Sequence, residues 1–184
     1  MNGVIETIVR TFSDRGSEAY GIECVTQLEH ALQSAQLAMN ECAGDALVAA
    51  ALLHDIGHIL DTEELPKDCD ANLDDRHEER AYDWLVGIFG REVADPVRLH
   101  VPAKRYLCTV EPEYEKALTP TSHKSYLDQG GPMTEAELAQ FRAEPNCEAA
   151  VRLRRWDDAA KVAGKATPHI EAFVPQLWAV LEDA

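Results

Sequence analysis

The chain has 184 residues, of which 46% are hydrophobic, and this is enough for one domain with a substantial core. Acidic residues outnumber basic ones by 33 to 17, and the formal net charge of −16 argues against nucleic acids and anionic membrane surfaces as partners. The five cysteines form no C-x-x-C pair, and the first residues lack the apolar core of a signal peptide, so we expect a cytoplasmic protein without a disulfide framework.

Helical patterns recur in the first third of the chain, and no segment shows the sustained alternation of a strand. Residues 2–13 carry apolar side chains at helical intervals. Thr26 followed by Glu29 has the spacing of a capping box and predicts a helix over 26–41. Residues 45–60 are apolar nearly all round, which predicts a central, buried helix.

The remaining segments are also mostly helical in pattern. Thr134 with Glu137 repeats the capping-box spacing, and Pro175 is a favourable first residue for the last helix. We expect further helices over 74–90, 91–107, 134–142, 147–163 and 174–183, and irregular structure over 64–75, 111–123 and 129–133. The prediction is therefore one compact all-α domain over residues 1–184, a helical bundle.

The central segment ALVAAALLHDIGHIL holds three ionisable groups, His54, Asp55 and His58. A carboxylate in such an apolar run costs several kcal/mol unless a paired charge or a metal compensates it. On one helix the two histidines, four residues apart, share a face. Hydrogen-bonded core residues or a surface stripe are the alternative interpretation. Gly57 favours a site, because glycine weakens a helix and often marks the close approach of another group.

Possible partners for this triplet lie on other predicted helices. One histidine falls on each of three of them, and an aspartate follows a tryptophan on a fourth: His30, His77, His100 and Asp157. Mixed imidazole and carboxylate ligands suit Fe, Mn, Zn or Ni in the core of a bundle. Five or six ligands around one central carboxylate suit two metals that this carboxylate bridges. Taken alone, His77 reads as a solvated surface residue.

The full pattern resembles the HD-domain superfamily, many of whose members are metal-dependent phosphohydrolases. It is most similar to a smaller branch of mixed-valent di-iron oxygenases that cleave phosphonates. The similarity extends from Tyr20 to Asp157 and is carried by the stretches YGIECVTQLEHALQSAQLA, ALLHDIGHIL, HVPAKRYL, SHKSYLDQGGPM and RLRRWD. HVPAKRYL and QGGPM do not belong to the general HD pattern and make the resemblance specific.

The resemblance implies a pair of iron ions, Fe(II)/Fe(III), with O2 as co-substrate. It assigns His30, His54 and Asp157 to the first ion. It assigns His77 and His100 to the second ion, with Asp55 bridging the two. His58 is left outside the ligand set and is implied to donate to the phosphonate.

The phosphonate cradle is also visible in the residue types, because a phosphonate needs charge-assisted donors such as Lys and Arg. Lys104 follows His100 by one turn and matches the family position. Ser122, Ser125 and Gln129 lie in a hydroxyl-rich stretch that we expect to be a loop. Arg154, three residues before Asp157, shares its helix face. A solvated helix face with ion pairs is the alternative for Arg154 and its neighbours Arg152 and Arg155.

Tyr20 and Glu23 are implied to close the site at the other end of the substrate. In this branch the tyrosine occupies the first iron until substrate arrives, and the glutamate meets the substrate's ammonium. The local order here is Tyr-Gly-Ile-Glu, where the branch has Tyr-Ile-Gly-Glu, so the spacing is kept and the glycine moves. A primary ammonium would hydrogen-bond to Glu23, whereas a trimethylammonium would need aromatic faces.

The implied activity is O2-dependent cleavage of the C–P bond of 2-amino-1-hydroxyethylphosphonate or its N-trimethyl analogue. The products would be phosphate and glycine or glycine betaine. One alternative is an HD-type metal-dependent phosphohydrolase, and another is a regulatory module without catalysis. Tyr20, Glu23 and HVPAKRYL favour the oxygenase, and the complete ligand set weighs against the regulatory module.

Overall fold

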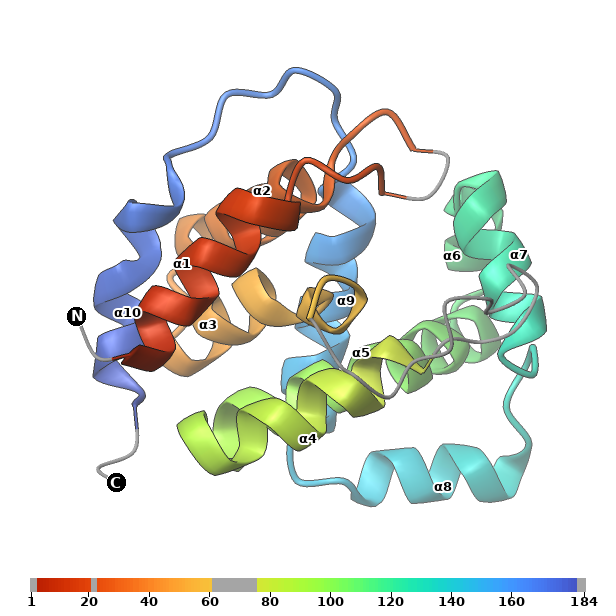
Figure 1. Cartoon of the computed structure of the whole chain (residues 1–184). Helices are drawn as coiled ribbons and strands as arrows, with labels where there is room; N and C mark the ends of the chain where they lie inside the picture. The colour runs from red at the N-terminus through yellow and green to blue at the C-terminus, as the bar shows by residue number, and fades with distance from the viewer. Residues whose placement is uncertain (1–2, 21–22, 61–75, 182–184) are drawn as a thin grey trace.

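The computed structural model describes residues 3–20, 23–60 and 76–181. Within these ranges the regular elements are helices, and an isolated bridge joins Ala19 and Thr26 (Figure 1). This confirms the all-α prediction. The helices are α1 (Gly3–Arg15), α2 (Gln27–Asn40), α3 (Asp45–Leu53), η1 (Ile56–His58), α4 (His77–Phe89), α5 (Arg91–Val110), α6 (Pro112–Ala117), α7 (Pro120–Asp128), α8 (Glu135–Ala143), α9 (Cys147–Ala159), η2 (Ile170–Phe173) and α10 (Val174–Ala179).

Helix α3 lies at the centre of the bundle and packs against α2, α5, α9 and α10. Helix α5 continues the contact network, since it packs along α4 and α9 and also contacts α6 and α8. Figure 1 shows α1, α2 and α10 on one side of α3, while α6, α7 and α8 lie at the opposite end of the molecule. The elements around α3 therefore form the body that carries the site.

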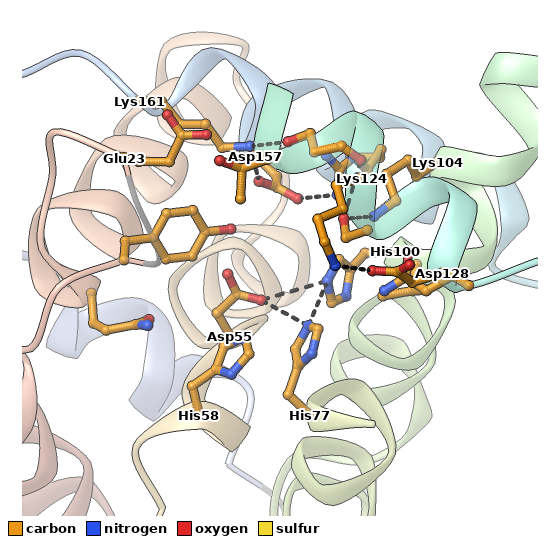
Figure 2. A pocket seen from close by; sticks show the side chains of 18 of the residues that line it. Glu23, Asp55, His58, His77, His100, Lys104, Lys124, Asp128, Asp157 and Lys161 are labelled. Atoms are coloured by element: carbon orange, nitrogen blue, oxygen red, sulfur yellow. Dashed lines mark hydrogen bonds and ion pairs between the residues drawn. The ribbon is translucent and has the colours of Figure 1, made fainter. Parts of the chain in front are cut away.

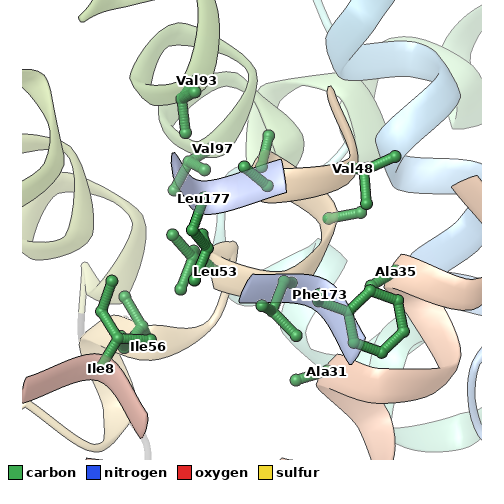
Figure 3. Close-up of a cluster of buried hydrophobic side chains, with 14 of the residues drawn as sticks. Ile8, Ala31, Ala35, Val48, Leu53, Ile56, Val93, Val97, Phe173 and Leu177 are labelled. Atoms are coloured by element: carbon green, nitrogen blue, oxygen red, sulfur yellow. The ribbon is translucent and has the colours of Figure 1, made fainter. Parts of the chain in front are cut away.

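The main hydrophobic core surrounds α3 and is assembled from both ends of the chain. Ile8 from α1, Leu53 from α3 and Leu177 from α10 are fully buried and belong to the same cluster (Figure 3). Truncating such a side chain to alanine costs about 2–5 kcal/mol. A second, smaller cluster joins α5, α8 and α9 around Leu99 and Phe141. Both clusters include residues of α5 and α9, so these two helices join the two parts of the core.

The predicted helix starts are confirmed at both capping boxes. Thr26 and Glu29 exchange side-chain and backbone hydrogen bonds at the start of α2, and Thr134 and Glu137 do the same before α8. Gly90 has φ 70°, a left-handed value that glycine adopts without strain, and it separates α4 from α5 as expected. Helix α5 runs unbroken through both of its prolines to Val110.

The prediction of one helix over 45–60 is wrong in its second half. Helix α3 ends at Leu53, residues 54–55 form a turn, and η1 follows over Ile56–His58. His54 and His58 therefore do not share the face of one helix. The apolar pattern could not reveal this break, because the turn is as buried as the helix before it.

The prediction of irregular structure over 111–123 is also wrong. This stretch contains α6 and the first turns of α7, so Ser122 and Ser125 lie on a helix and Gln129 is its C-terminal cap. Both helices begin with proline, and the Thr119 side chain accepts a hydrogen bond from the Ser122 backbone N–H. A capping residue followed by proline is a helix-start signal that the sequence did contain.

Smaller differences concern helix ends. Helix α9 stops at Ala159 rather than 163, so Lys161 lies beyond the helix, and α10 stops at Ala179, short of the predicted end at 183. The predicted irregular segment 64–75, residues 21–22 of the Tyr-Gly-Ile-Glu order and residues 182–183 of the last predicted helix lie outside the described residues. Among the described helices, none combines the length and apolar character needed to cross a membrane.

Candidate metal centre and adjoining pocket

The six predicted ligands converge at the centre of the bundle. They come from α2, the turn after α3, and helices α4, α5 and α9, and all are buried: His30, His54, Asp55, His77, His100 and Asp157. Sequence separations of up to 127 residues are closed by the packing of these helices on α3 and on each other. His77 is buried as well, so its interpretation as a solvated residue is wrong.

One half of the cluster is formed by His30, His54 and Asp157. The Nε2 atoms of the two histidines are 3.1 Å apart, and His30 Nε2 lies 3.3 Å from Asp157 Oδ1. Asp55 Oδ2 faces the same group, at 3.5 Å from His30 Nε2 and 3.3 Å from His54 Nε2. This half therefore presents two imidazole nitrogens and two carboxylate oxygens to one point.

The other half is formed by His77 and His100. Their Nε2 atoms are 3.2 Å apart, and Asp55 Oδ1 lies 3.2 Å from His77 Nε2 and 3.5 Å from His100 Nε2 (Figure 2). Asp55 thus directs one carboxylate oxygen to each pair of histidines. This is the arrangement expected of a bridging carboxylate.

The ring orientations show that these nitrogens suit metal ions. The Nδ1 atoms of His30, His54 and His100 lie 3.0, 3.0 and 2.6 Å from the backbone carbonyl oxygens of Ala160, Ala51 and Val97. A carbonyl oxygen only accepts, so each Nδ1 carries a proton and each Nε2 is the nitrogen left to bind a metal. Facing lone pairs repel one another unless a cation lies between them, and ligand atoms bound about 2.1 Å from one ion are themselves roughly 3 Å apart.

The carboxylates support the same conclusion. Asp55 Oδ2 is buried and has no hydrogen-bond partner among the described residues. Burial opposes ionisation of Asp55, yet the surrounding histidines hold the pKa of its carboxyl well below the usual value. Burial likewise opposes charge on His30, but Asp157 and Asp55 together raise its pKa to about 9. The donor set fits two cations such as iron, which would replace the proton on His30.

Close backbone packing fixes the turn that carries Asp55. A Cβ atom on Gly57 would lie 2.1 Å from the backbone oxygen of His77, so only glycine fits there. The Arg80 guanidinium donates through Nε and Nη2 to the Gly57 carbonyl, at 3.2 and 3.1 Å. These contacts bind η1 to the first turns of α4 and set His77 against Asp55. The glycine noted in the sequence marks the approach of this helix.

His58 lies beside the second half of the cluster, as the last residue of η1. Its ring stacks on that of His77 with centroids 4.0 Å apart. One ring nitrogen each of His58 and His77 and one oxygen of Asp55 lie within 4.8 Å of each other. His58 also lines the adjoining pocket, so it can reach a molecule bound next to the metals.

A pocket of about 500 Å³ opens directly onto the cluster. Four of the six proposed ligands, Asp55, His77, His100 and Asp157, line this pocket and are labelled in Figure 2, and we call the six ligands together the metal floor. The predicted substrate residues also line it: Tyr20, Glu23, His58, Lys104, Ser122, Ser125, Gln129 and Arg154. The structure therefore brings the proposed substrate residues and four of the six proposed ligands around one cavity, while His30 and His54 belong to the cluster but do not line the cavity.

Lys104 is the cation that the sequence placed next to the second pair of histidines. Its ammonium donates to Ser125 Oγ at 2.7 Å, and Ser125 Oγ donates to the Ser122 carbonyl at 3.1 Å. Burial, together with nearby Arg154, lowers the pKa of Lys104 to about 7. The amide oxygen of Gln129 is buried without a hydrogen-bond partner among the described residues. The Lys104 ammonium gives this wall a donor for an anion.

Arg154 is buried and chiefly engaged with carboxylates. Its Nη1 lies 2.5 Å from Asp157 Oδ2, and Asp158 and the Tyr114 hydroxyl contact the remaining nitrogens. These contacts hold Asp157 in orientation, and burial of the aspartate is outweighed by Arg154 and Lys161, which keep its pKa well below the usual value. Arg154 thus stabilises a proposed ligand and adds positive charge to the pocket.

Tyr20 and Glu23 form the wall contributed by the N-terminal segment. The Tyr20 ring stacks on His30 with centroids 4.0 Å apart, and burial raises the pKa of its phenol well above the usual value, with added effects of Asp157 and Asp55. Glu23 Oε1 accepts a hydrogen bond of 2.7 Å from the Thr119 hydroxyl. This bond ties the N-terminal wall to the start of α7.

Sequence reasoning missed Lys161, which lines the pocket with its side chain only 7% exposed. A signal for it was present: Lys161 follows Asp157 by four residues, the spacing of an ion pair on a helix.

Comparison with known proteins agrees with this geometry. Residues 28–158 match the family model of the HD domain. The chain is 43% identical over 178 residues to a hydroxymethylphosphonate dioxygenase of Gimesia maris, covering 97% of the chain and 88% of that protein. It is 38% identical over 180 residues to the [1-hydroxy-2-(trimethylamino)ethyl]phosphonate dioxygenase (glycine-betaine-forming) of Leisingera caerulea, covering 97% and 91%.

Proposed function

We propose that this chain, which belongs to the phosphonate dioxygenase branch of the HD-domain family, cleaves the C–P bond of a 1-hydroxyalkylphosphonate with O2. The hydroxyl-bearing carbon would be oxidised to a carboxylate, the C–P bond would break, and phosphate would leave with one proton released. Both oxygen atoms of O2 would end in the products. The proposal rests most directly on Asp55, whose two oxygens face two separate pairs of histidines.

The residues of the proposed centre would hold two iron ions. One would be bound by His30, His54 and Asp157, the other by His77 and His100, and Asp55 would bridge them. Bound iron would supply Lewis acidity and the redox chemistry that O2 requires. The protein's own contribution is ligand orientation, which the backbone carbonyls behind the rings provide.

The pocket wall above the metal floor would bind and orient the phosphonate. Lys104 presents an ammonium one turn after His100, Ser125 holds that ammonium through its hydroxyl oxygen, and His58 lines the pocket beside His77. Charge-assisted hydrogen bonds of this kind fix an anion strongly in a buried site. Holding the phosphonate there would keep the adjacent hydroxyl-bearing carbon over the two metals.

The end of the pocket formed by Tyr20 and Glu23 would determine which substituent the reacting carbon of the substrate can carry. Tyr20 is the only Phe, Tyr or Trp among the described lining residues, and its ring already contacts His30 and Lys161. A trimethylammonium group prefers several open aromatic faces, which this wall does not offer. We therefore favour a hydrogen or a primary aminomethyl group on the reacting carbon, with Glu23 as partner for the amine.

The test is phosphate release from iron-loaded protein in the presence and absence of O2. Hydroxymethylphosphonate, 2-amino-1-hydroxyethylphosphonate and its N-trimethyl analogue would be compared. We expect O2-dependent release, and the carbon product should be formate from the first substrate and glycine from the second. Release that persists without O2 would refute the oxygenase proposal and favour a phosphohydrolase.

A further inference from the structure

Lys161 lies just beyond the end of α9, in the pocket wall above Asp157. Its side chain is 7% exposed, and it lines the same cavity as the metal cluster. In Figure 2 Lys161 and Lys104 lie on either side of Asp157, with Asp55, His58 and His77 below them. A buried ammonium in this place needs acceptors, because an uncompensated charge is costly away from water.

The backbone around Lys161 is held on both sides by α2. His30 Nδ1 donates to the carbonyl of Ala160 at 3.0 Å. The Gln33 side-chain amide donates to the Val162 carbonyl at 3.0 Å and accepts from the Val162 N–H at 3.1 Å. Gln33 is itself fully buried. The residue between these two anchors is therefore placed by the core of the bundle rather than by a free loop.

The ammonium of Lys161 has more donors than the described residues use. An ammonium carries three N–H groups, and Lys161 Nζ donates to Ser122 Oγ at 3.0 Å. Its distances to Asp157 Oδ1 and Asp158 Oδ1 are 3.4 and 3.7 Å, beyond the usual hydrogen-bond range. Donor capacity thus remains on a cation that borders the pocket.

Lys104 and Lys161 each donate a hydrogen bond to a serine of α7. Lys104 donates to Ser125 and Lys161 donates to Ser122, and these serines lie one turn apart on α7. The result is a wall with an ammonium at each side of two hydroxyl groups. A tetrahedral oxyanion is the ligand class that accepts from several such donors at once.

We propose that Lys161 is a phosphonate-binding residue, the second ammonium of a cradle that it forms with Lys104, Ser122 and Ser125. This inference rests on the proposed function for the identity of the substrate. The binding of a tetrahedral oxyanion can be measured without turnover, with inorganic phosphate, the expected product. A structural role is the competing explanation, in which Lys161 serves only to orient Asp157.

The experiment measures the dissociation constant of inorganic phosphate by calorimetry on iron-loaded protein, together with iron content. The variants are Lys161→Met, Lys161→Arg and the control Lys165→Met, since Lys165 is exposed. We expect Lys161→Met to weaken phosphate binding by about 10- to 100-fold with iron content unchanged, because a hydrogen bond to a charged group is worth that much. Lys161→Arg should stay within a few-fold of the wild type.

Two results would overturn the proposal. One is unchanged phosphate affinity in Lys161→Met, and the other is a loss of iron that matches the loss of phosphate binding. In steady-state kinetics Lys161→Met should raise KM for the phosphonate more than it lowers kcat. A wild type that binds phosphate through Lys161 but cleaves no phosphonate would refute the proposed function and leave this inference intact.

Discussion

The metal floor of the pocket and the wall formed by α7 and the N-terminal segment are built in different ways. The metal floor consists of buried side chains on helices packed around α3, and backbone carbonyls fix the imidazole rings of His30, His54 and His100. The wall formed by α7 and the N-terminal segment is instead held by hydrogen bonds between side chains, such as those from Lys104 to Ser125 and from Thr119 to Glu23. Backbone-anchored groups have little freedom, whereas lysine and serine side chains can rearrange around a ligand.

This difference in construction suits the metal floor and the α7 wall to different tasks, chemistry and substrate selection. The floor is suited to chemistry that demands fixed geometry, because its ring orientations follow from the fold. The opposite wall is suited to selection of a substrate, because single side chains can change there without disturbing the core. Substitutions in the floor should therefore abolish metal binding and activity together, and substitutions in the wall should change affinity, pH dependence or substrate preference.

The largest effect is expected for Asp55→Ala, which removes a proposed ligand from both metals. Activity should fall by well over about 100-fold, since even a residue behind a metal ligand contributes about 10- to 100-fold. Iron content measured by inductively coupled plasma spectrometry should fall for both sites. Asp95→Asn is the control, because Asp95 is also a buried aspartate but contacts Asn146 and is not a proposed ligand. This variant should bind as much iron as the wild type. An active Asp55→Ala variant would refute the bridge.

The second effect concerns the packing that sets His77. Gly57→Ala would place a Cβ atom 2.1 Å from the His77 backbone oxygen, so η1 and α4 must separate. We expect a loss of about 1–3 kcal/mol in the free energy of unfolding, as overpacking usually costs, together with loss of the metal at His77 and His100. Thermal unfolding measures the loss of stability, and iron analysis measures the loss of metal.

The matched control for this packing is Gly87→Ala. Gly87 lies within α4, and a Cβ atom there meets nothing within 4 Å. Alanine in a helix is favoured over glycine by about 0.5–1 kcal/mol, so this variant should be neutral or slightly stabilised. If both variants unfolded at the wild-type temperature, the contact between Gly57 and His77 would not hold the site.

A moderate effect is expected from the pH dependence of the α7 wall. The pKa of Lys104, lowered by burial to about 7, means that its charged form is lost as pH rises through this value. KM for the phosphonate should therefore rise above pH 7. The difference between wild type and Lys104→Met isolates this titration from that of the substrate. Parallel pH profiles in the two proteins would contradict the assignment.

The same titration acts on stability with the opposite sign. Between pH 7 and the ordinary lysine pKa of 10.5 the unfolded chain binds more protons at Lys104 than the folded chain does. This group therefore makes the folded protein more stable as pH rises across that window. Chemical unfolding of wild type and Lys104→Met at several pH values measures the contribution.

The smallest effect is expected for Glu23→Gln, which keeps an acceptor for Thr119 and removes one charge. With hydroxymethylphosphonate, kcat/KM should change by less than about threefold. With 2-amino-1-hydroxyethylphosphonate it should fall by roughly 10-fold or more, the value of one charge-assisted hydrogen bond. Equal losses for both substrates would show that Glu23 does not select the substituent.

The sequence was sufficient for most of the metal floor. Helical periodicity, with a capping box for α2, located the helices that carry His30, His77, His100 and Asp157. The burial of His77 could not be read from the sequence, because charged residues flank it. The end of α3 after Leu53 could not be predicted from the sequence, because a hydrophobic pattern indicates burial but not a turn. This turn directs Asp55 to both pairs of histidines.

The opposite wall was predicted less well, for a physical reason. Helices α6 and α7 are short and polar, so they lack the apolar stripe that marks longer helices, and their Thr-Pro and Glu-Pro starts were the remaining signals. Lys161 lies outside any helix, and its position depends on contacts of Ala160 and Val162 with α2 across the bundle. Such contacts follow from tertiary packing, so the spacing of four residues from Asp157 was the local signal that remained for Lys161.

The central claim is that Asp55 joins two metal sites in one floor, and the iron content of wild type and His100→Ala tests it most directly. We expect about two iron ions in the wild-type chain and about one in the variant, with the electron paramagnetic resonance signal of a coupled pair present only in the wild type. A wild-type chain saturated by a single iron ion, or a His100→Ala variant that retains the coupled pair, would contradict the account.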